Sequence, residues 1–192
     1  MKKFMVIILG NILFNRIWSM PNKETFKIKP IKRILGKYIG GLFDSEKWID
    51  PFAGNNSPAN YRNDLNPDVK TLWHLEAIDF VRLMNKDNVL FDGCLFDPPY
   101  SPRQIKECYD GFGLKANTKA TFYPKVKDEL ALVIKPNGIA ISFGWNSNGF
   151  GKCRGFELIE VLLIAHGGSH NDTIVTIERK VNQTKILRGR DE

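Results

Sequence analysis

A short apolar run that ends in two prolines constrains the fold of this chain more than any other feature. Residues 91–96 are rich in apolar, β-prone side chains, and Asp97-Pro98-Pro99-Tyr100 follows directly. The run predicts a buried strand. The prolines end it, because neither can donate a hydrogen bond to a neighbouring strand and each fixes φ. In open α/β sheets, ligands bind beyond the carboxyl ends of the strands, so we expect a ligand-binding loop at residues 97–100.

The groups in this loop suit a planar substrate that carries an exocyclic amine. The carboxylate of Asp97 and the carbonyl of Pro98 can accept hydrogen bonds from the amine, and Pro99 offers a second carbonyl. The ring of Tyr100 can stack on the substrate. A plain strand followed by a proline-rich turn is the alternative, so the rest of the chain must decide between them.

The loop resembles the catalytic motif of the S-adenosylmethionine-dependent amino-methyltransferases, above all the adenine-N6 DNA methyltransferases. That motif reads Asp, Asn or Ser, then Pro-Pro, then an aromatic residue. A second stretch, Asp50-Pro51-Phe52-Ala53-Gly54-Asn55-Asn56, resembles the family's cofactor-binding turn, Asp-Pro-Phe-x-Gly-x-Gly. The second glycine of that turn is Asn56 here. Asn tolerates left-handed backbone geometry better than most residues, so we expect the turn to survive.

The same resemblance implies the remaining cofactor contacts. The pair Lys29-Pro30, followed by apolar residues at helical spacing over 31–39, resembles motif X, which helps to cover the methionine end of the cofactor. Asp64 matches the acid that binds the ribose at the end of the second strand, and a turn or cap role is its alternative. Glu76 matches the acid that accepts from the cofactor's adenine amine. The implied cofactor-binding residues are Phe26, Lys29, Asp50, Phe52, Gly54, Asp64 and Glu76.

The order of the hydrophobic patterns predicts an α/β fold. We expect helices at 31–39, 103–109 and 123–133, and strands at 48–50, within 61–67, and at 91–96, 139–143, 156–165 and 173–179. Residues 72–84 could form one helix by their pattern, and the resemblance implies instead a short strand at 73–75 and a helix at 78–84. A glycine-rich tip joins the last two strands and predicts a hairpin. With the resemblance, this implies a Rossmann-like methyltransferase fold, with a mostly parallel seven-stranded sheet and a C-terminal antiparallel β-hairpin.

We divide the chain into an extension at 1–13, a methyltransferase domain at 14–180 and a polar tail at 181–192. The extension begins with two lysines and an apolar run, as a short signal peptide does. It is too short to span a bilayer, and no Ala-x-Ala cleavage site follows. Either a poorly anchored segment or an added strand of the sheet fits this pattern.

The net charge of +7, from 28 Lys and Arg against 21 Asp and Glu, favours an anionic partner, nucleic acid first. A glycine-rich basic loop at 144–155 is expected at the same sheet edge as Asp97. The resemblance adds the tip of the hairpin, which corresponds to motif VIII. No segment has the length of a separate recognition domain, so we expect a short target, or specificity from a second subunit or a homodimer. The candidate nucleic-acid contacts are Arg103, Lys106, Lys152, Arg154, His170 and Asn171.

The resemblance implies a cytoplasmic enzyme that transfers a methyl group from S-adenosylmethionine to the N6 amine of adenine in DNA. The target base must be flipped out of the stack to reach the site. The three cysteines form neither a zinc pattern nor a disulfide framework, which indicates a reducing interior. We expect no metal and no membrane partner. A base amino-methyltransferase acting on RNA, for example at guanine N2, and an inactive nucleic-acid-binding remnant stay open as alternatives.

Overall fold

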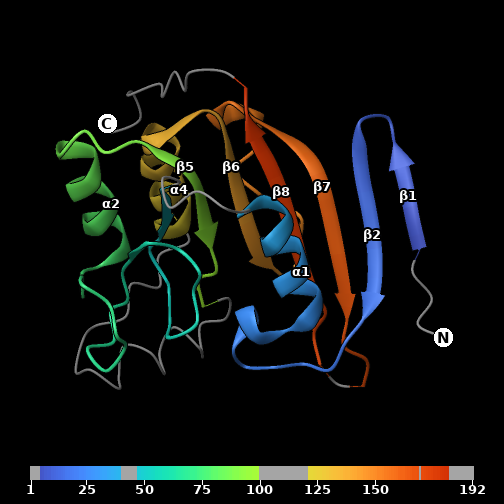
Figure 1. Ribbon diagram of the computed structural model, residues 1–192. Coiled ribbons are helices and arrows are strands. Elements are labelled where there is room, and N and C mark those ends of the chain that lie inside the picture. The colour runs from blue at the N-terminus through green and yellow to red at the C-terminus, as the bar shows by residue number, and fades with distance from the viewer. Residues whose placement is uncertain (1–4, 40–46, 100–120, 169, 182–192) are drawn as a thin grey trace.

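An eight-stranded sheet forms the centre of the protein in a computed structural model, which describes residues 5–39, 47–99, 121–168 and 170–181 (Figure 1). The order of the strands across the sheet is β1-β2-β7-β8-β6-β5-β3-β4. Their bounds are β1 Met5–Leu9, β2 Ile12–Trp18, β3 Trp48–Asp50, β4 Tyr61–Arg62, β5 Phe91–Phe96, β6 Ile134–Gly144, β7 Phe156–Ala165 and β8 Thr173–Lys180.

The sheet has the topology that the sequence predicts. Strands β4, β3, β5 and β6 are parallel neighbours, and β8 lies antiparallel between β6 and β7. The mostly parallel Rossmann-like sheet with its C-terminal hairpin is therefore confirmed. The predicted number of seven strands is corrected to eight for the described residues. An N-terminal hairpin adds two strands, while residues 73–75 contribute only an isolated bridge between Asn63 and Trp73.

Helices cover both faces of the sheet. The helix α1 (Lys29–Tyr38) lies on one face, and α2 (Ala77–Lys86) and α4 (Phe122–Val133) lie on the other (Figure 1). Successive residues of β5 point to opposite faces, so Cys94 packs with α2 and α4 while Leu95 packs with α1. The predicted helix at 103–109 lies outside the described residues. No helix in the described part of the chain is long and apolar enough to cross a membrane.

The N-terminal hairpin is built into the sheet rather than appended to it. Strand β2 pairs in parallel with β7, from Leu13 opposite Glu160 to Trp18 opposite Ala165. The side chain of Asn15 donates to the buried Glu160 at 2.8 Å. The predicted boundary between residues 13 and 14 falls inside β2. Of the two interpretations of the extension, the added strand is therefore the one that agrees with the structure at residues 12–18.

Candidate functional site

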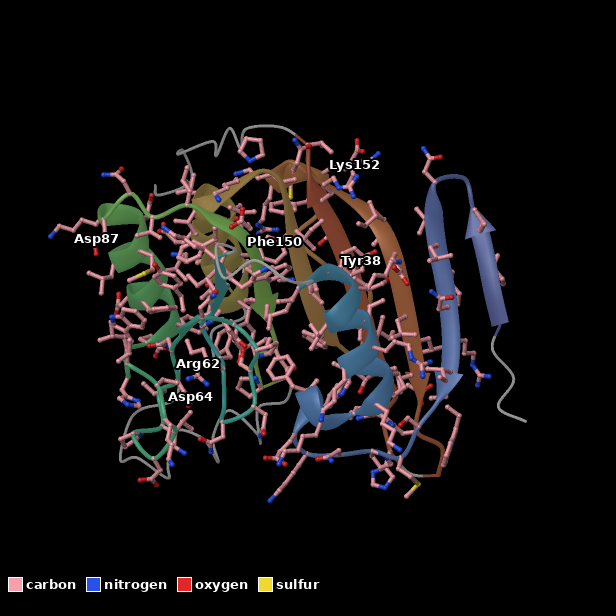
Figure 2. The ribbon with its side chains drawn as sticks, viewed as in Figure 1. Tyr38, Arg62, Asp64, Asp87, Phe150 and Lys152 are labelled. Atoms are coloured by element: carbon pink, nitrogen blue, oxygen red, sulfur yellow. The ribbon has the colours of Figure 1, made fainter. Side chains whose placement is uncertain are left out.

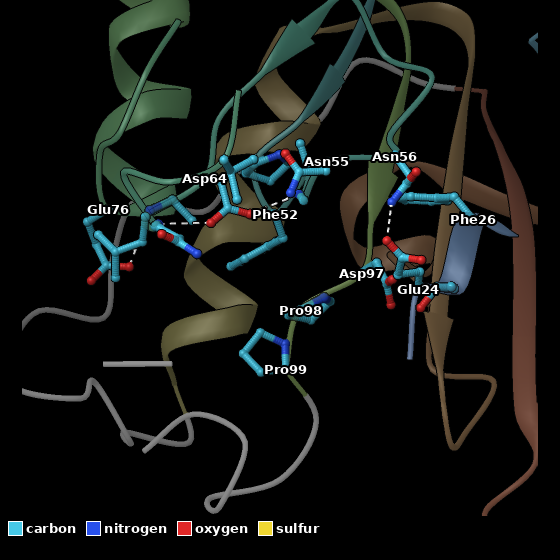
Figure 3. A pocket seen from close by; sticks show the side chains of 18 of the residues that line it. Glu24, Phe26, Phe52, Asn55, Asn56, Asp64, Glu76, Asp97, Pro98 and Pro99 are labelled. Atoms are coloured by element: carbon cyan, nitrogen blue, oxygen red, sulfur yellow. Dashed lines mark hydrogen bonds between the residues drawn. The ribbon is translucent and has the colours of Figure 1, made fainter. Parts of the chain in front are cut away.

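A cavity of about 490 Å³ lies where β3, β4 and β5 end (Figure 3). This volume is typical of sites for small molecules. Three of its walls are the segments that directly follow these strands, at 51–56, 64–66 and 97–99. The remaining walls are residues 23–26 before α1, Val69, residues 75–77 at the start of α2, and Phe122 with Tyr123 at the start of α4. The cavity is therefore at the edge of the sheet where open α/β folds bind ligands.

A tight turn at Gly54 presents backbone to the cavity. Gly54 has a φ of +54°, which favours glycine because it has no Cβ. A Cβ built there meets nothing within 4 Å, so the backbone faces open space. The Gly54 N–H donates to one carboxylate oxygen of Asp64 at 2.8 Å, and the N–H of Asn66 donates to the other at 2.9 Å. Asp64 thus lines the cavity and also holds the turn. This position is compatible with both predicted roles, the acid that contacts a ligand and the turn residue.

Asn56, which replaces the second glycine of the resembled motif, does not use left-handed geometry. Among the described residues, the non-glycine positions with positive φ are Asn88 and Asn137. The turn is therefore present, as expected, but Asn56 does not use the left-handed backbone that Asn tolerates. Its side-chain amide instead donates to Glu24 at 2.6 Å, a bond that Figure 3 shows as a dashed line. The bond ties the turn after β3 to the segment before α1.

A buried asparagine that the sequence analysis missed joins three loops beside the cavity. Asn63 is fully buried. Its amide donates to the carbonyls of Pro51 and Leu75, at 3.1 and 2.9 Å, and its side-chain oxygen accepts from the Leu75 N–H. These bonds replace part of the strand pairing that residues 73–75 lack. Only the tertiary arrangement reveals this role, because an Asn before Asp64 reads as a turn residue.

The Asp50 carboxylate lies beneath the turn and does not line the cavity. It is fully buried, and it accepts from the Phe52 N–H at 2.9 Å and from the Ser57 hydroxyl at 2.6 Å. Burial raises the pKa of Asp50 to about 7, and the nearby charges of Asp97 and Asp64 add to the rise, while the two hydrogen bonds oppose it. The sequence predicts that Asp50 contacts the cofactor directly or through water, whereas the structure places its carboxylate outside the lining of the cavity, where it holds the turn.

The raised pKa of Asp50 predicts a pH-dependent stability. Its pKa rises from an ordinary 3.8 to about 7 on folding, so the folded protein binds this proton more tightly than the unfolded chain does. The stabilisation is present below the unfolded pKa and is lost as the pH rises through the folded one. Relative to Asp50→Asn, the wild-type free energy of unfolding should fall by about 1.4 kcal/mol per pH unit from about pH 5 to about pH 7. Urea denaturation of both proteins measures this, and parallel pH profiles would contradict it.

The loop after β5 is held from the opposite wall of the cavity. Asp97, Pro98 and Pro99 all line the cavity. The Tyr123 hydroxyl donates to the Pro99 carbonyl at 2.8 Å, and the Tyr123 ring packs edge-on against Phe52. The Pro99 carbonyl therefore has a partner within the protein. Tyr100 lies outside the described residues.

The cavity is rich in carboxylates although the protein is basic. Figure 3 shows Glu76 and Asp64 toward one side of the cavity, and Asp97 and Glu24 toward the other. Lys23 also lines it, and Lys27 forms an ion pair with Glu24 at 2.7 Å. Such a lining favours a ligand with positive charge and many hydrogen-bond donors. The described residues contain no group of three or more His, Cys, Asp or Glu that could hold a metal ion.

Most of the residues proposed from sequence as catalytic or cofactor-binding surround this one cavity. Lys29 is an exception, because it is exposed on α1 and does not line the cavity, so its predicted place at the cofactor is corrected. The sequence analysis placed Asn56 in the cofactor-binding turn, but it missed Lys23, Glu24 and Tyr123 as cavity residues. The predicted residues that line it are Phe26, Phe52, Gly54, Asp64, Glu76, Asp97, Pro98 and Pro99.

The basic loop before β7 lies at the wrong edge of the sheet for the predicted contact. Strands β6 and β7 are both antiparallel to β8, so they run in the same direction. The loop between them must cross from the carboxyl edge to the amino edge, where Lys152 and Arg154 precede β7 (Figure 2). Arg154 is also bound within the fold, to Asp128 at 2.7 Å and to the Phe150 carbonyl at 2.9 Å. The prediction that Lys152 and Arg154 lie beside Asp97 is therefore wrong.

The other candidate nucleic-acid contacts differ in position. His170 and Asn171 are exposed on the turn between β7 and β8. This turn is at the same edge as Asp97, but it joins strands two and three positions away from β5 in the sheet, or about 10–14 Å. The candidates Arg103 and Lys106 lie outside the described residues.

Solved methyltransferase structures share this fold. One, a protein from Streptococcus mutans assigned as a SAM-dependent methyltransferase, matches with a TM-score of 0.52 and 14% identity over 91% of this chain and 55% of that chain. Another, the protein yhhF from Escherichia coli, assigned as a methyltransferase, matches with a TM-score of 0.54 and 10% identity over 94% of this chain and 100% of that chain. The methyltransferase SMU.776, complexed with SAH, gives a TM-score of 0.52 at 12% identity.

The chain spans about half the length of the Streptococcus mutans protein and of SMU.776. No protein-family model and no curated protein matches the chain. At these identities the likeness establishes the fold: the chain has the Rossmann-like fold of SAM-dependent methyltransferases.

Proposed function

We propose that the protein transfers the methyl group of S-adenosylmethionine to the N6 amine of adenine in DNA. One observation carries the proposal: the open glycine turn, the acidic residues and the Asp97-Pro98-Pro99 loop line a single cavity. A cofactor and a substrate amine can therefore meet within it. The shared fold supports the same reading.

The lining of the cavity fits this cofactor. S-adenosylmethionine carries more positive than negative charge, from its sulfonium and ammonium groups, and it offers hydroxyl and amine donors. Asp64 and Glu76 suit the ribose hydroxyls and the adenine amine, while Glu24 lines the cavity on the side of Asp97 (Figure 3). Charge-assisted hydrogen bonds of this kind are stronger than neutral ones. When bound, the cofactor supplies an activated methyl group.

The loop after β5 supplies the groups that position the substrate. The Asp97 carboxylate and the Pro98 carbonyl accept hydrogen bonds from the exocyclic amine and orient the lone pair of its nitrogen. The carboxylate also stabilises the positive charge that forms on this nitrogen during transfer. The amine cannot reach the cavity from inside a duplex, so the base must be flipped out.

Product analysis tests the proposal directly. The purified chain is incubated with S-adenosylmethionine labelled in its methyl group and with either DNA or RNA, and each nucleic acid is then digested to nucleosides. We expect the label in N6-methyldeoxyadenosine from DNA. Label in N2-methylguanosine from RNA would establish the alternative activity and overturn the DNA assignment.

Calorimetric titration with S-adenosylhomocysteine separates an enzyme from an inactive remnant. The cavity, with its four carboxylates, predicts saturable binding at one site per chain. A chain that is folded but does not bind this compound would support the remnant.

A further inference from the structure

Most of the net positive charge of the protein is concentrated in one short segment. Residues 23–37 contain six Lys or Arg and one acid, Glu24, which gives +5 of the total net charge of +7. This segment includes α1 and the residues that line the cavity immediately before it. The rest of the chain has a net charge of +2, so this segment carries most of the charge imbalance of the protein.

The helix α1 separates its apolar and basic residues onto two faces. Ile31, Ile34 and Leu35 are buried against the sheet. Lys29, Lys32 and Arg33 are exposed, and positions i, i+3 and i+4 share one side of a helix. The outer face of α1 is therefore a basic stripe, and its contact with the sheet holds this stripe rigidly in place.

Neither ion pairing nor helix stability explains the stripe. Lys27 and Lys37 have acidic partners, Glu24 and Glu160. The side chains of the three stripe residues form no ion pair or hydrogen bond with any other residue that the structure describes. Like charges at this spacing destabilise a helix. An anionic partner outside the protein would neutralise them.

The position of α1 beside the cavity identifies the partner. The helix begins three residues after Phe26, which lines the cavity, and it rises about 1.5 Å per residue from there. Duplex DNA presents about one negative charge per 1.7 Å of its axis. We propose that Lys29, Lys32 and Arg33 bind the phosphates of a DNA duplex next to the cavity while the target base enters it. This inference rests on the proposed function, and it gives Lys29 a role outside the cofactor site.

An anionic membrane surface is the competing partner for a basic helix. The apolar face that would enter a bilayer is buried against the sheet in α1. Membrane-binding amphipathic helices bind through such a face. The geometry therefore favours DNA.

The double variant Lys32→Ala with Arg33→Ala tests the proposal. Neither residue lines the cavity, and both side chains are exposed, so the affinity for S-adenosylhomocysteine should stay within twofold of wild type. The affinity for a fluorescein-labelled DNA duplex, measured by anisotropy, should fall about tenfold or more at physiological salt. The slope of log affinity against log salt should become shallower by about 1.8, since each phosphate contact contributes about 0.9.

A matched variant removes the same charge elsewhere. Arg16→Ala with Lys86→Ala changes two exposed basic residues, on β2 and at the end of α2. We expect it to change the affinity for DNA less than twofold and to leave the salt slope unchanged. Equal losses in the two double variants would overturn the proposal, because net charge alone would then explain binding.

Two further binding measurements distinguish between the possible partners. RNA of the same sequence should bind less tightly than the DNA duplex, and vesicles of phosphatidylcholine and phosphatidylserine should not bind. Tighter binding to RNA, or binding to vesicles but not to DNA, would overturn the proposal. DNA binding through α1 without a methylated base would instead contradict the proposed function alone. Normal methylation of DNA by the Lys32 and Arg33 double variant would contradict this inference alone.

Discussion

Replacing Asp97 by Ala should lower the rate of methyl transfer about 10²–10³-fold, the effect of removing one preorganised polar group from an active site. Asp97 lines the cavity directly after β5, where the loop is held by the bond from Tyr123 to Pro99. Its carboxylate is the charged acceptor that the proposed reaction requires, and no other described residue lies in that loop with the same charge. The rate is measured as transfer of labelled methyl groups to DNA.

Two further variants separate catalysis from general effects. Asp97→Asn keeps a side-chain carbonyl as an acceptor but loses the negative charge, so its rate should lie between wild type and Asp97→Ala. Asp68→Ala removes an exposed carboxylate that does not line the cavity, and it should transfer methyl groups like wild type. Wild-type activity in a folded Asp97→Ala protein would refute the role of Asp97.

The sequence predicts the central strands well, because their positions are determined by runs of apolar residues that must be buried. Strand β5 occupies residues 91–96, as its apolar run indicates, and β7 occupies 156–165. The turn signals that end these runs also place the acids after β4 and β5, Asp64 and Asp97, at one edge of the sheet. Local patterns therefore suffice for the walls of the cavity that follow directly from strands.

Contacts between segments that are distant in sequence could not be predicted in the same way. Glu24 and Asn56 are 32 residues apart, and Tyr123 is 24 residues from Pro99. No pattern within either segment indicates its partner, because a polar side chain near a turn is also typical of solvent-exposed loops. The site residues that the sequence did not predict are those that reach the cavity because α1 and α4 pack on the sheet.

The error at Lys152 and Arg154 has a topological cause. The predicted hairpin already makes β6 and β7 parallel, because β8 lies between them and is antiparallel to both. A connection between two parallel strands must run back from the carboxyl end of one strand to the amino end of the other. Assigning the whole glycine-rich loop to one edge ignored this return, so the basic residues at its end were placed on the wrong side.

A single buried carboxylate joins the N-terminal hairpin, α1 and β7. Glu160 on β7 is 2% exposed. It accepts from the Asn15 amide at 2.8 Å, from the Lys37 ammonium at 2.5 Å and from the Tyr38 hydroxyl at 2.6 Å. Burial, together with the hydrogen bond to Glu160, raises the pKa of Tyr38, so its hydroxyl stays protonated and continues to donate. These three partners are more than 120 residues from Glu160 in sequence. Sequence patterns alone therefore could not show whether residues 1–13 form an added strand or a loose extension.

Glu160→Ala should therefore destabilise the protein by about 2–4 kcal/mol. The change leaves the buried amide of Asn15 and the part-buried hydroxyl of Tyr38 without an acceptor. A fully buried donor without an acceptor costs about 1–3 kcal/mol, and the part-buried hydroxyl costs less because water can reach it. Lys37 is half-exposed and can turn to water, so its lost ion pair contributes little. Urea denaturation measures the change. Glu157→Ala, at an exposed position on the same strand, should stay within about 0.5 kcal/mol of wild type.

The conservative variant Glu160→Gln distinguishes hydrogen bonding from packing. Its amide keeps one oxygen acceptor in the same volume, so its loss of stability should lie between those of Glu157→Ala and Glu160→Ala. If Glu160→Ala lost no more stability than Glu157→Ala, the hairpin and α1 would be held by their apolar contacts alone. In that case Ile17 of β2 and Ile31 of α1, both buried in the same cluster, would be the residues that fix the hairpin and the basic stripe against the sheet.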